Sequence, residues 1–76
     1  SMKEAVIEIL EDIISDDIDL KTCTSLIDDK YLDSYDIVSL VSDLNEAFGV
    51  DINVIHLLPE NFNSIDAIVA LIESLQ

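Results

Sequence analysis

Three stretches of the chain repeat their apolar residues with the period of an α-helix, and this pattern decides the fold class. The stretches cover residues 3–14, 34–48 and 65–75. Their apolar residues recur every three or four positions and not at every second position, which predicts amphipathic helices and excludes strands. The chain has only one Gly and one Pro, too few for several hairpin turns. The sequence therefore predicts an all-α domain.

Each predicted helix contributes an apolar stripe to the expected core. On the first helix the stripe consists of Val6, Ile7, Leu10, Ile13 and Ile14. On the middle helix it consists of Ile37, Val38, Leu40, Val41, Leu44, Ala47 and Phe48. On the last helix it consists of Ile65, Ile68, Val69, Ile72 and Leu75.

The ends of these helices carry local signals. Asp33 is the expected N-cap of the middle helix, and Asp36 adds negative charge to its first turn, where the helix dipole favours it. Gly49, the only Gly, is the expected C-terminal stop. Ser64 is the expected cap of the last helix.

Two connections join the predicted helices. Residues 15–33 are too long for a bare turn in so small a domain, so their apolar side chains are expected to pack onto the core. These side chains are Ile18, Leu20, Leu26, Ile27 and Leu32. Residues 53–58 form either a short helix, with Asn53 as cap and Pro59 as terminator, or an irregular apolar loop. The second alternative stands because one and a half turns do not hold themselves together.

The charge balance limits the possible partners. Asp and Glu number 17 against three Lys and no Arg, which gives a net charge of -14. Such a chain lacks the cations that neutralise nucleic-acid phosphates, and anionic membranes repel it. No run approaches the roughly 18 apolar residues that span a membrane. The expected partner is a protein with a basic surface, approached under electrostatic steering.

The length of 76 residues predicts one domain, residues 1–76. A single Cys excludes an internal disulfide. No basic run precedes an apolar stretch at the N-terminus, so the expected location is the cytoplasm. Ser1 ahead of Met2 looks like an expression scar and has no part in the functional interpretation.

Catalytic and metal-binding patterns are absent, so the chain is not expected to be an enzyme. His56 and Cys23 are the only residues of their types, and no pattern places either in a catalytic triad. The best candidate calcium loop begins at Asp17, but it puts Thr22 where Gly is needed and ends on Asp28 in place of Glu. No metal site is predicted.

One polar residue, Ser34, lies at a position where a group could be attached covalently. Ser34 begins the middle helix after a long connection. An Asp-Ser pair at such a place is a common capping signal, so Ser34 could simply help begin the helix. An anion attached to Ser34 would, however, meet free backbone N–H groups and the positive end of the helix dipole. Beyond Ser34, four polar residues fall within an arc of roughly 80°: Asp36, Ser39, Asp43 and Glu46.

These residues carry a resemblance to a known family. The chain resembles the acyl carrier proteins, small helical domains that bear a 4′-phosphopantetheine arm. The strongest part is LDSYDIVSLVSDLNEAFGVDI, residues 32–52, where Asp33 and Ser34 match the family's Asp-Ser. The resemblance implies a four-helix bundle of the acyl-carrier type, with three longer helices, one short helix and a long first loop.

The sequence differs from the family's usual pattern at two places, and one segment is similar to a particular branch of the family. Tyr35 replaces the Leu of the family's usual Asp-Ser-Leu, and Tyr31 and Leu32 occupy the stretch where the family often has Gly. Residues 52–68 are similar to the D-alanyl carrier proteins, a branch with a longer loop and an aromatic residue before the last helix. Phe62 is that aromatic.

The resemblance implies roles for named residues. Ser34 is the attachment site of the phosphopantetheine, whose thiol holds an acyl or aminoacyl group as a thioester. Asp33 orients Ser34 or approaches the metal of the transferase. The residues expected to contact partners are Asp36, Ile37, Asp43 and Glu46.

The implied partners are a phosphopantetheinyl transferase, an adenylating enzyme that loads the arm, and an acyl-accepting enzyme with a basic surface. The carrier is expected to be a monomer. Two alternatives remain open at this point: a D-alanyl carrier for cell-wall polymers, and an acidic helical adaptor without a covalent arm.

Overall fold

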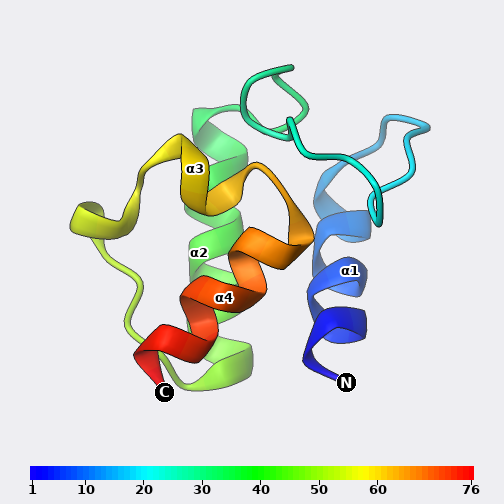
Figure 1. The fold of residues 1–76 in the computed structure, drawn as a ribbon. Helices are drawn as coiled ribbons and strands as arrows, with labels where there is room; N and C mark the ends of the chain where they lie inside the picture. The colour runs from blue at the N-terminus through cyan, green and yellow to red at the C-terminus, as the bar shows by residue number, and fades with distance from the viewer.

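The computed structural model describes residues 1–76 and contains helices and loops only (Figure 1). The three longer helices are α1 (Met2–Ile13), α2 (Ser34–Phe48) and α4 (Ile65–Leu75). A single-turn helix, α3 (Pro59–Phe62), and one 3₁₀ turn, η1 (Val54–His56), lie between α2 and α4. The predicted all-α class, with three longer helices, one short helix and a long first loop, is confirmed. No helix combines the length and the apolar character needed to cross a membrane.

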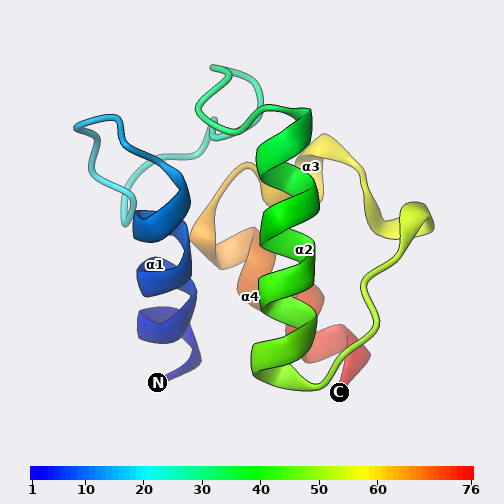
Figure 2. The ribbon, with the colours of Figure 1, turned by 180° about the vertical axis from the view of Figure 1, so that it is seen from behind.

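The helices pack as a small bundle in which α1 contacts both α2 and α4, and α3 contacts α4. The chain runs along α1, crosses one end of the bundle in the long connection, and returns along α2 (Figures 1 and 2). The last helix ends near the same end of the bundle as the N-terminus. This topology puts the start of α2 at the end that the long connection covers.

Local signals account for the ends of the helices. Ser64 caps α4 by accepting a hydrogen bond from the backbone N–H of Ala67, and Gly49 ends α2 in a left-handed conformation, φ +63°. Ser1 caps α1 by accepting from the backbone N–H of Glu4. Hydrogen bonding by Ser1 and the N-terminal ammonium lower the pKa of the Glu4 carboxyl below its ordinary value.

The core is entirely hydrophobic, with no buried polar side chain. It includes apolar side chains from the connections as well as from the helices. Within the long connection, Leu26 and Leu32 are buried, while Ile18, Leu20 and Ile27 pack half-buried against the core. The prediction that the connection packs onto the core is confirmed. The buried residues are Val6, Leu10, Ile14, Leu26, Leu32, Leu40, Leu44, Ile52, Phe62, Ile65, Ile68, Leu71 and Ile72.

The prediction that Val38 lies on the buried side of α2 is wrong. Its side chain is 69% exposed, whereas Leu40 and Leu44 are buried. Two residues of helix correspond to a rotation of about 200°, so Val38 faces away from the side that Leu40 buries. Ala47, also expected on the buried side, is exposed in the last turn.

The segment 53–58 also differs from its prediction. Asn53 is a cap, since its Oδ1 accepts from the N–H of Ile55 at 3.2 Å, but the turn is 3₁₀ and ends at His56. Pro59 does not terminate a helix; it begins α3. The first helical position suits Pro, because its fixed φ is helical and its missing N–H has no intrahelical acceptor there. The short helix of the bundle therefore lies later in the chain than predicted.

Candidate functional site

Ser34 is the first residue of α2, and its side chain is exposed. The residues on either side of it cap the helix without its help. Asp33 Oδ1 accepts a hydrogen bond from the backbone N–H of Asp36 at 2.7 Å, and Asp36 Oδ2 accepts from the backbone N–H of Asp33 at 3.1 Å. The Ser34 hydroxyl makes no hydrogen bond within the chain. Ser34 is therefore not the cap, and its hydroxyl is available to an enzyme.

The backbone at the start of α2 offers further donors. The N–H groups of Ser34 and Tyr35 have no acceptor within the chain, whereas the N–H of Ile37 bonds to the carbonyl oxygen of Asp33 at 3.0 Å. Free N–H groups in the first turn, together with the helix dipole, favour an anion such as a phosphate. The site thus combines a free hydroxyl with unused donors for a phosphodiester attached to it.

The predicted partner residues occupy different environments on α2. Asp43 and Glu46 are exposed, Ile37 is half-buried, and Asp36 is half-buried with one oxygen used in capping. None of the three acids takes part in an ion pair; the two ion pairs of the molecule involve Ser1 with Glu4 and Lys3 with Asp66. These carboxylates can therefore meet cations from outside the chain.

A small apolar groove, here called the Ile37 groove, opens beside the first turn of α2. Its volume is about 110 Å³. It is lined by residues from the long connection, from α2 and from the segment that contains α3: Ile27, Ile37, Leu57, Leu58, Pro59 and Phe62. Ile37 lies one turn after Ser34, so the groove is next to the candidate attachment site.

Sequence reasoning missed several large apolar side chains that the structure leaves exposed to solvent. Tyr35 is 79% exposed and Val38 69%; their spacing of three residues puts them on one face of α2. Val54 and Ile55 on η1, and Leu57 and Leu58 after it, are exposed as well. Of these side chains, Leu57 and Leu58 also line the Ile37 groove, and an apolar patch at a groove is typical of interaction surfaces. The run Val54–Ile55 could have been recognised, because a single turn between polar residues cannot bury both side chains.

Asn63 is a second residue that the sequence did not single out. Its carbonyl oxygen accepts from the N–H of Leu26 at 3.0 Å, and its Oδ1 accepts from the N–H groups of Ile27 at 3.0 Å and Asp28 at 3.1 Å. Its Nδ2 donates to Asp28 Oδ2 at 3.2 Å. Asn63 thereby fixes the second half of the long connection against the α3–α4 junction, and with it Ile27 as a wall of the Ile37 groove.

Comparisons with known proteins agree with this geometry. The sequence pattern of the family described as "Phosphopantetheine attachment site" matches residues 4–72. A D-alanyl carrier protein from Lactobacillus acidophilus is 30% identical over 74 residues, which cover 97% of this chain and 94% of that protein. No solved structure matches the sequence.

The chain therefore belongs to the phosphopantetheine-binding carrier family, and the D-alanyl branch is the one to which it shows similarity. Its cofactor is a covalently attached 4′-phosphopantetheine. The free hydroxyl at the start of α2 and the unused N–H groups beside it fit that group. Family membership does not agree with the alternative of an adaptor that lacks a covalent arm.

Proposed function

We propose that Ser34 carries the 4′-phosphopantetheine and that the chain presents a D-alanyl group, as a thioester on this arm, to partner enzymes. The observation that supports the attachment site is the exposed Ser34 hydroxyl, which makes no hydrogen bond because Asp33 and Asp36 cap the helix between themselves. The arm supplies the reactive thiol. The chain contributes the attachment point and the surfaces that partners recognise.

Attachment uses a phosphopantetheinyl transferase with coenzyme A as donor. Ser34 Oγ forms a bond to the phosphorus next to the pantetheine, the diphosphate P–O bond breaks, and the nucleotide half leaves as its phosphate. The Ser34 proton passes to a base of the transferase. Asp33 Oδ1 is used for capping, but Oδ2 makes no hydrogen bond and is free to approach the transferase's metal ion.

Partner recognition uses the surface of α2. Asp43 and Glu46 steer enzymes with basic surfaces toward the carrier, which raises association rates more than affinity. Asp36 adds its free oxygen to this surface. Ile37, which is half-buried one turn after Ser34, provides the apolar contact. Weak, rapidly reversible contacts suit a carrier that visits a transferase, a loading enzyme and an acceptor enzyme in turn.

The size of the Ile37 groove supports a small cargo. The groove volume of about 110 Å³ lies below the range of about 300–1,000 Å³ found for ligand pockets. This small size favours a short acyl group over a long fatty acyl chain, and the ammonium of a D-alanyl group would stay in solvent because the groove lining is apolar. The similar protein from L. acidophilus is named a D-alanyl carrier protein. The alternative to a D-alanyl cargo is another short acyl group carried on the same arm.

Intact-mass measurement tests the attachment site. The chain is incubated with coenzyme A and a transferase of broad specificity, and we expect a mass gain of one phosphopantetheinyl group. Ser34→Ala should abolish this gain, whereas Ser42→Ala, on the same helix and also exposed, should retain it. A mass gain that survives Ser34→Ala would disprove the assignment of Ser34.

A loading assay tests the cargo separately. The phosphopantetheinylated chain is offered to an adenylating enzyme specific for D-alanine and, in parallel, to one that activates long fatty acids. We expect a thioester only with D-alanine. Efficient loading with a long fatty acid and none with D-alanine would exclude the D-alanyl cargo while leaving Ser34 as the attachment site.

A further inference from the structure

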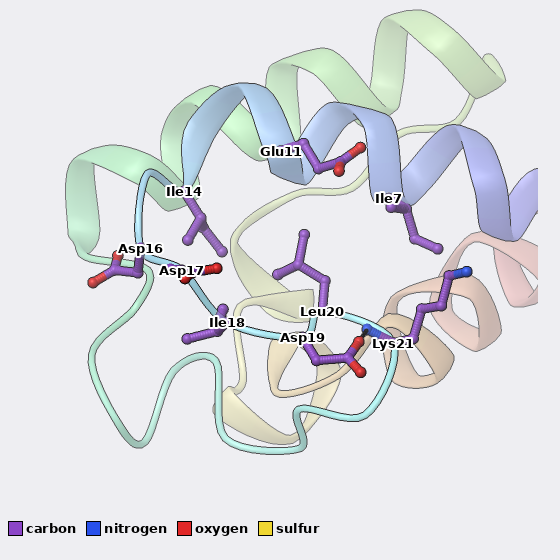
Figure 3. Close-up of a pocket in the computed structure, with 9 residues that line it drawn as sticks. All are labelled: Ile7, Glu11, Ile14, Asp16, Asp17, Ile18, Asp19, Leu20 and Lys21. Carbon is purple, nitrogen blue, oxygen red and sulfur yellow. Dashed lines mark hydrogen bonds between the residues drawn. The ribbon is translucent and has the colours of Figure 1, made fainter.

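A second and larger groove lies between α1 and residues 16–21 of the long connection (Figure 3). This groove, here called the α1 groove, has a volume of about 520 Å³. That volume is within the range of about 300–1,000 Å³ found for ligand pockets. It shares no lining residue with the Ile37 groove, and the proposed carrier function leaves it without a role.

The floor of the α1 groove is apolar. Ile7 and Ile14 come from α1 and its C-terminal end, and Ile18 and Leu20 come from the connection. Ile14 is buried, while the other three are half-buried and keep part of their surface open to solvent. Figure 3 shows Leu20 pointing from the connection toward α1. The floor can therefore receive an aliphatic side chain from another molecule.

The rim of the α1 groove is acidic. Glu11, Asp16, Asp17 and Asp19 are exposed, and only Lys21 has the opposite charge; four carboxylates and one ammonium leave a local net charge of −3. None of these groups takes part in an ion pair. The carboxylates of Asp16 and Asp17 accept no hydrogen bond, and the carboxylate of Asp19 accepts only one, from the backbone N–H of Lys21 at 3.0 Å. Their mutual repulsion is therefore unrelieved within the chain.

We propose that the α1 groove is a docking site for a protein segment that presents one aliphatic side chain between Lys or Arg residues. The aliphatic side chain contacts the apolar floor, and the flanking cations meet the carboxylates of the rim. Charge complementarity selects this occupant over a second copy of the chain, which carries a net charge of -14 and has only three Lys. The rim acids do not form a metal site, because no three of them come together around one point.

Titration with a short peptide tests the proposal by nuclear magnetic resonance. The probe is acetyl-Lys-Leu-Lys-amide added to the isotope-labelled chain, without the arm, at low salt. We expect the largest amide shift changes within residues 7–21. Glu11→Gln combined with Asp17→Asn, one acid from each wall, should lower the affinity about three- to tenfold, as expected for two exposed ion pairs. Acetyl-Lys-Gly-Lys-amide should bind about threefold or more weakly than the leucine peptide.

The matched control removes the same charge elsewhere. Asp51→Asn combined with Glu73→Gln, two exposed acids outside both grooves and outside the proposed partner surface of α2, leaves the α1 groove intact and should change the affinity less than twofold. Equal weakening by the two double variants, or shift changes centred on α2, would show that the peptide follows net charge alone and would overturn the proposal. Equal binding of the two peptides, or the same shift changes produced by magnesium chloride at lower concentration, would also overturn it. The test needs no phosphopantetheine, so its failure leaves the assignment of Ser34 untouched.

Discussion

The two halves of the long connection contain similar numbers of acids and use them differently. In residues 26–33, Asp28 Oδ2 accepts from Asn63, Asp29 Oδ2 accepts from Ser25 at 2.6 Å, and Asp33 Oδ1 accepts from the N–H of Asp36. In residues 15–21, the carboxylates of Asp16 and Asp17 accept no hydrogen bond, and that of Asp19 accepts one, from the N–H of Lys21 at 3.0 Å. The carboxylates of the second half order the backbone that leads to Ser34, while most of those in the first half have no partner within the chain. All of these residues are Asp, so the residue type does not explain the difference. A carboxylate orders the chain where a hydrogen-bond donor of the chain lies within reach, and stays open to solvent where none does.

The largest expected effect comes from Asn63→Ala, which removes the side-chain contacts that order the second half. Two backbone N–H groups and Asp28 lose their partner, so we expect the free energy of unfolding to fall by about 2 kcal/mol. In a domain of this size that lowers the melting temperature by roughly 8–16 °C. Asn61→Ala is the control, because the side chain of Asn61 donates a single hydrogen bond, to the carbonyl oxygen of His56. A melting temperature lowered no more by Asn63→Ala than by Asn61→Ala would contradict this account.

Two substitutions of Asp33 distinguish its role in capping α2 from its proposed role in phosphopantetheinylation. Asp33→Ala removes the cap of α2 and should lower the free energy of unfolding by about 1–2 kcal/mol, measured by denaturant titration. Asp33→Asn keeps a capping oxygen and should be nearly as stable as the parent chain. If Asp33 also approaches the transferase's metal, Asp33→Asn should still slow phosphopantetheinylation. Unchanged modification by Asp33→Asn would restrict Asp33 to capping.

Lys30 is the one strained residue of the second half. Its φ of 63° is left-handed, and it is the only non-Gly residue with a positive φ. The stretch before the Asp where the family often has Gly therefore does contain a glycine-like conformation, at Lys30 and not at Tyr31 or Leu32. Lys30→Gly should stabilise the chain by about 0.5–1 kcal/mol, since relief of strain exceeds the added flexibility of Gly. Lys30→Ala, which removes the charge but not the strain, should give no such gain in melting temperature.

Two double variants, each neutralising two acids in one half of the long connection, test whether the acids of the two halves differ in their effect on stability. Asp16→Asn with Asp17→Asn should raise the melting temperature slightly, because repulsion falls and no hydrogen bond is lost. Asp28→Asn with Asp29→Asn makes the same change in charge but replaces two charge-assisted hydrogen bonds with neutral ones, so it should leave the melting temperature unchanged or lower it. The same sign and size of change in both variants would mean that the two halves do not differ.

Salt should give the smallest and most general effect. Moderate sodium chloride or magnesium chloride screens repulsion among the unpaired acids and should raise the melting temperature of the parent chain. The rise should be smaller for the variant in which Asp16 and Asp17 are neutral. A melting temperature that is the same at low and moderate salt would show that these acids do not repel one another appreciably.

Much of the fold could be predicted from the sequence because it depends on local signals. The bounds of α2 and α4 agree with the prediction, and those of α1 differ by one residue, since period and caps act within about one turn. The expected Asp33 cap and Gly49 stop are present. The single-turn α3 was misplaced, because one turn is held by packing and not by its own hydrogen bonds.

The sequence by itself determined the three longer helices, the caps of α2 and α4 and the net charge of -14, and family resemblance led to Ser34 as the proposed attachment site. The tertiary structure decided that Val38 faces solvent. It also decided that Asn63 holds residues 35 or 36 positions away. Contacts across such separations depend on how the helices and loops pack together. The periodicity of apolar residues and the capping residues are local signals, so they do not predict that packing. The two grooves exist for the same reason, since each is lined by segments that only the fold brings together.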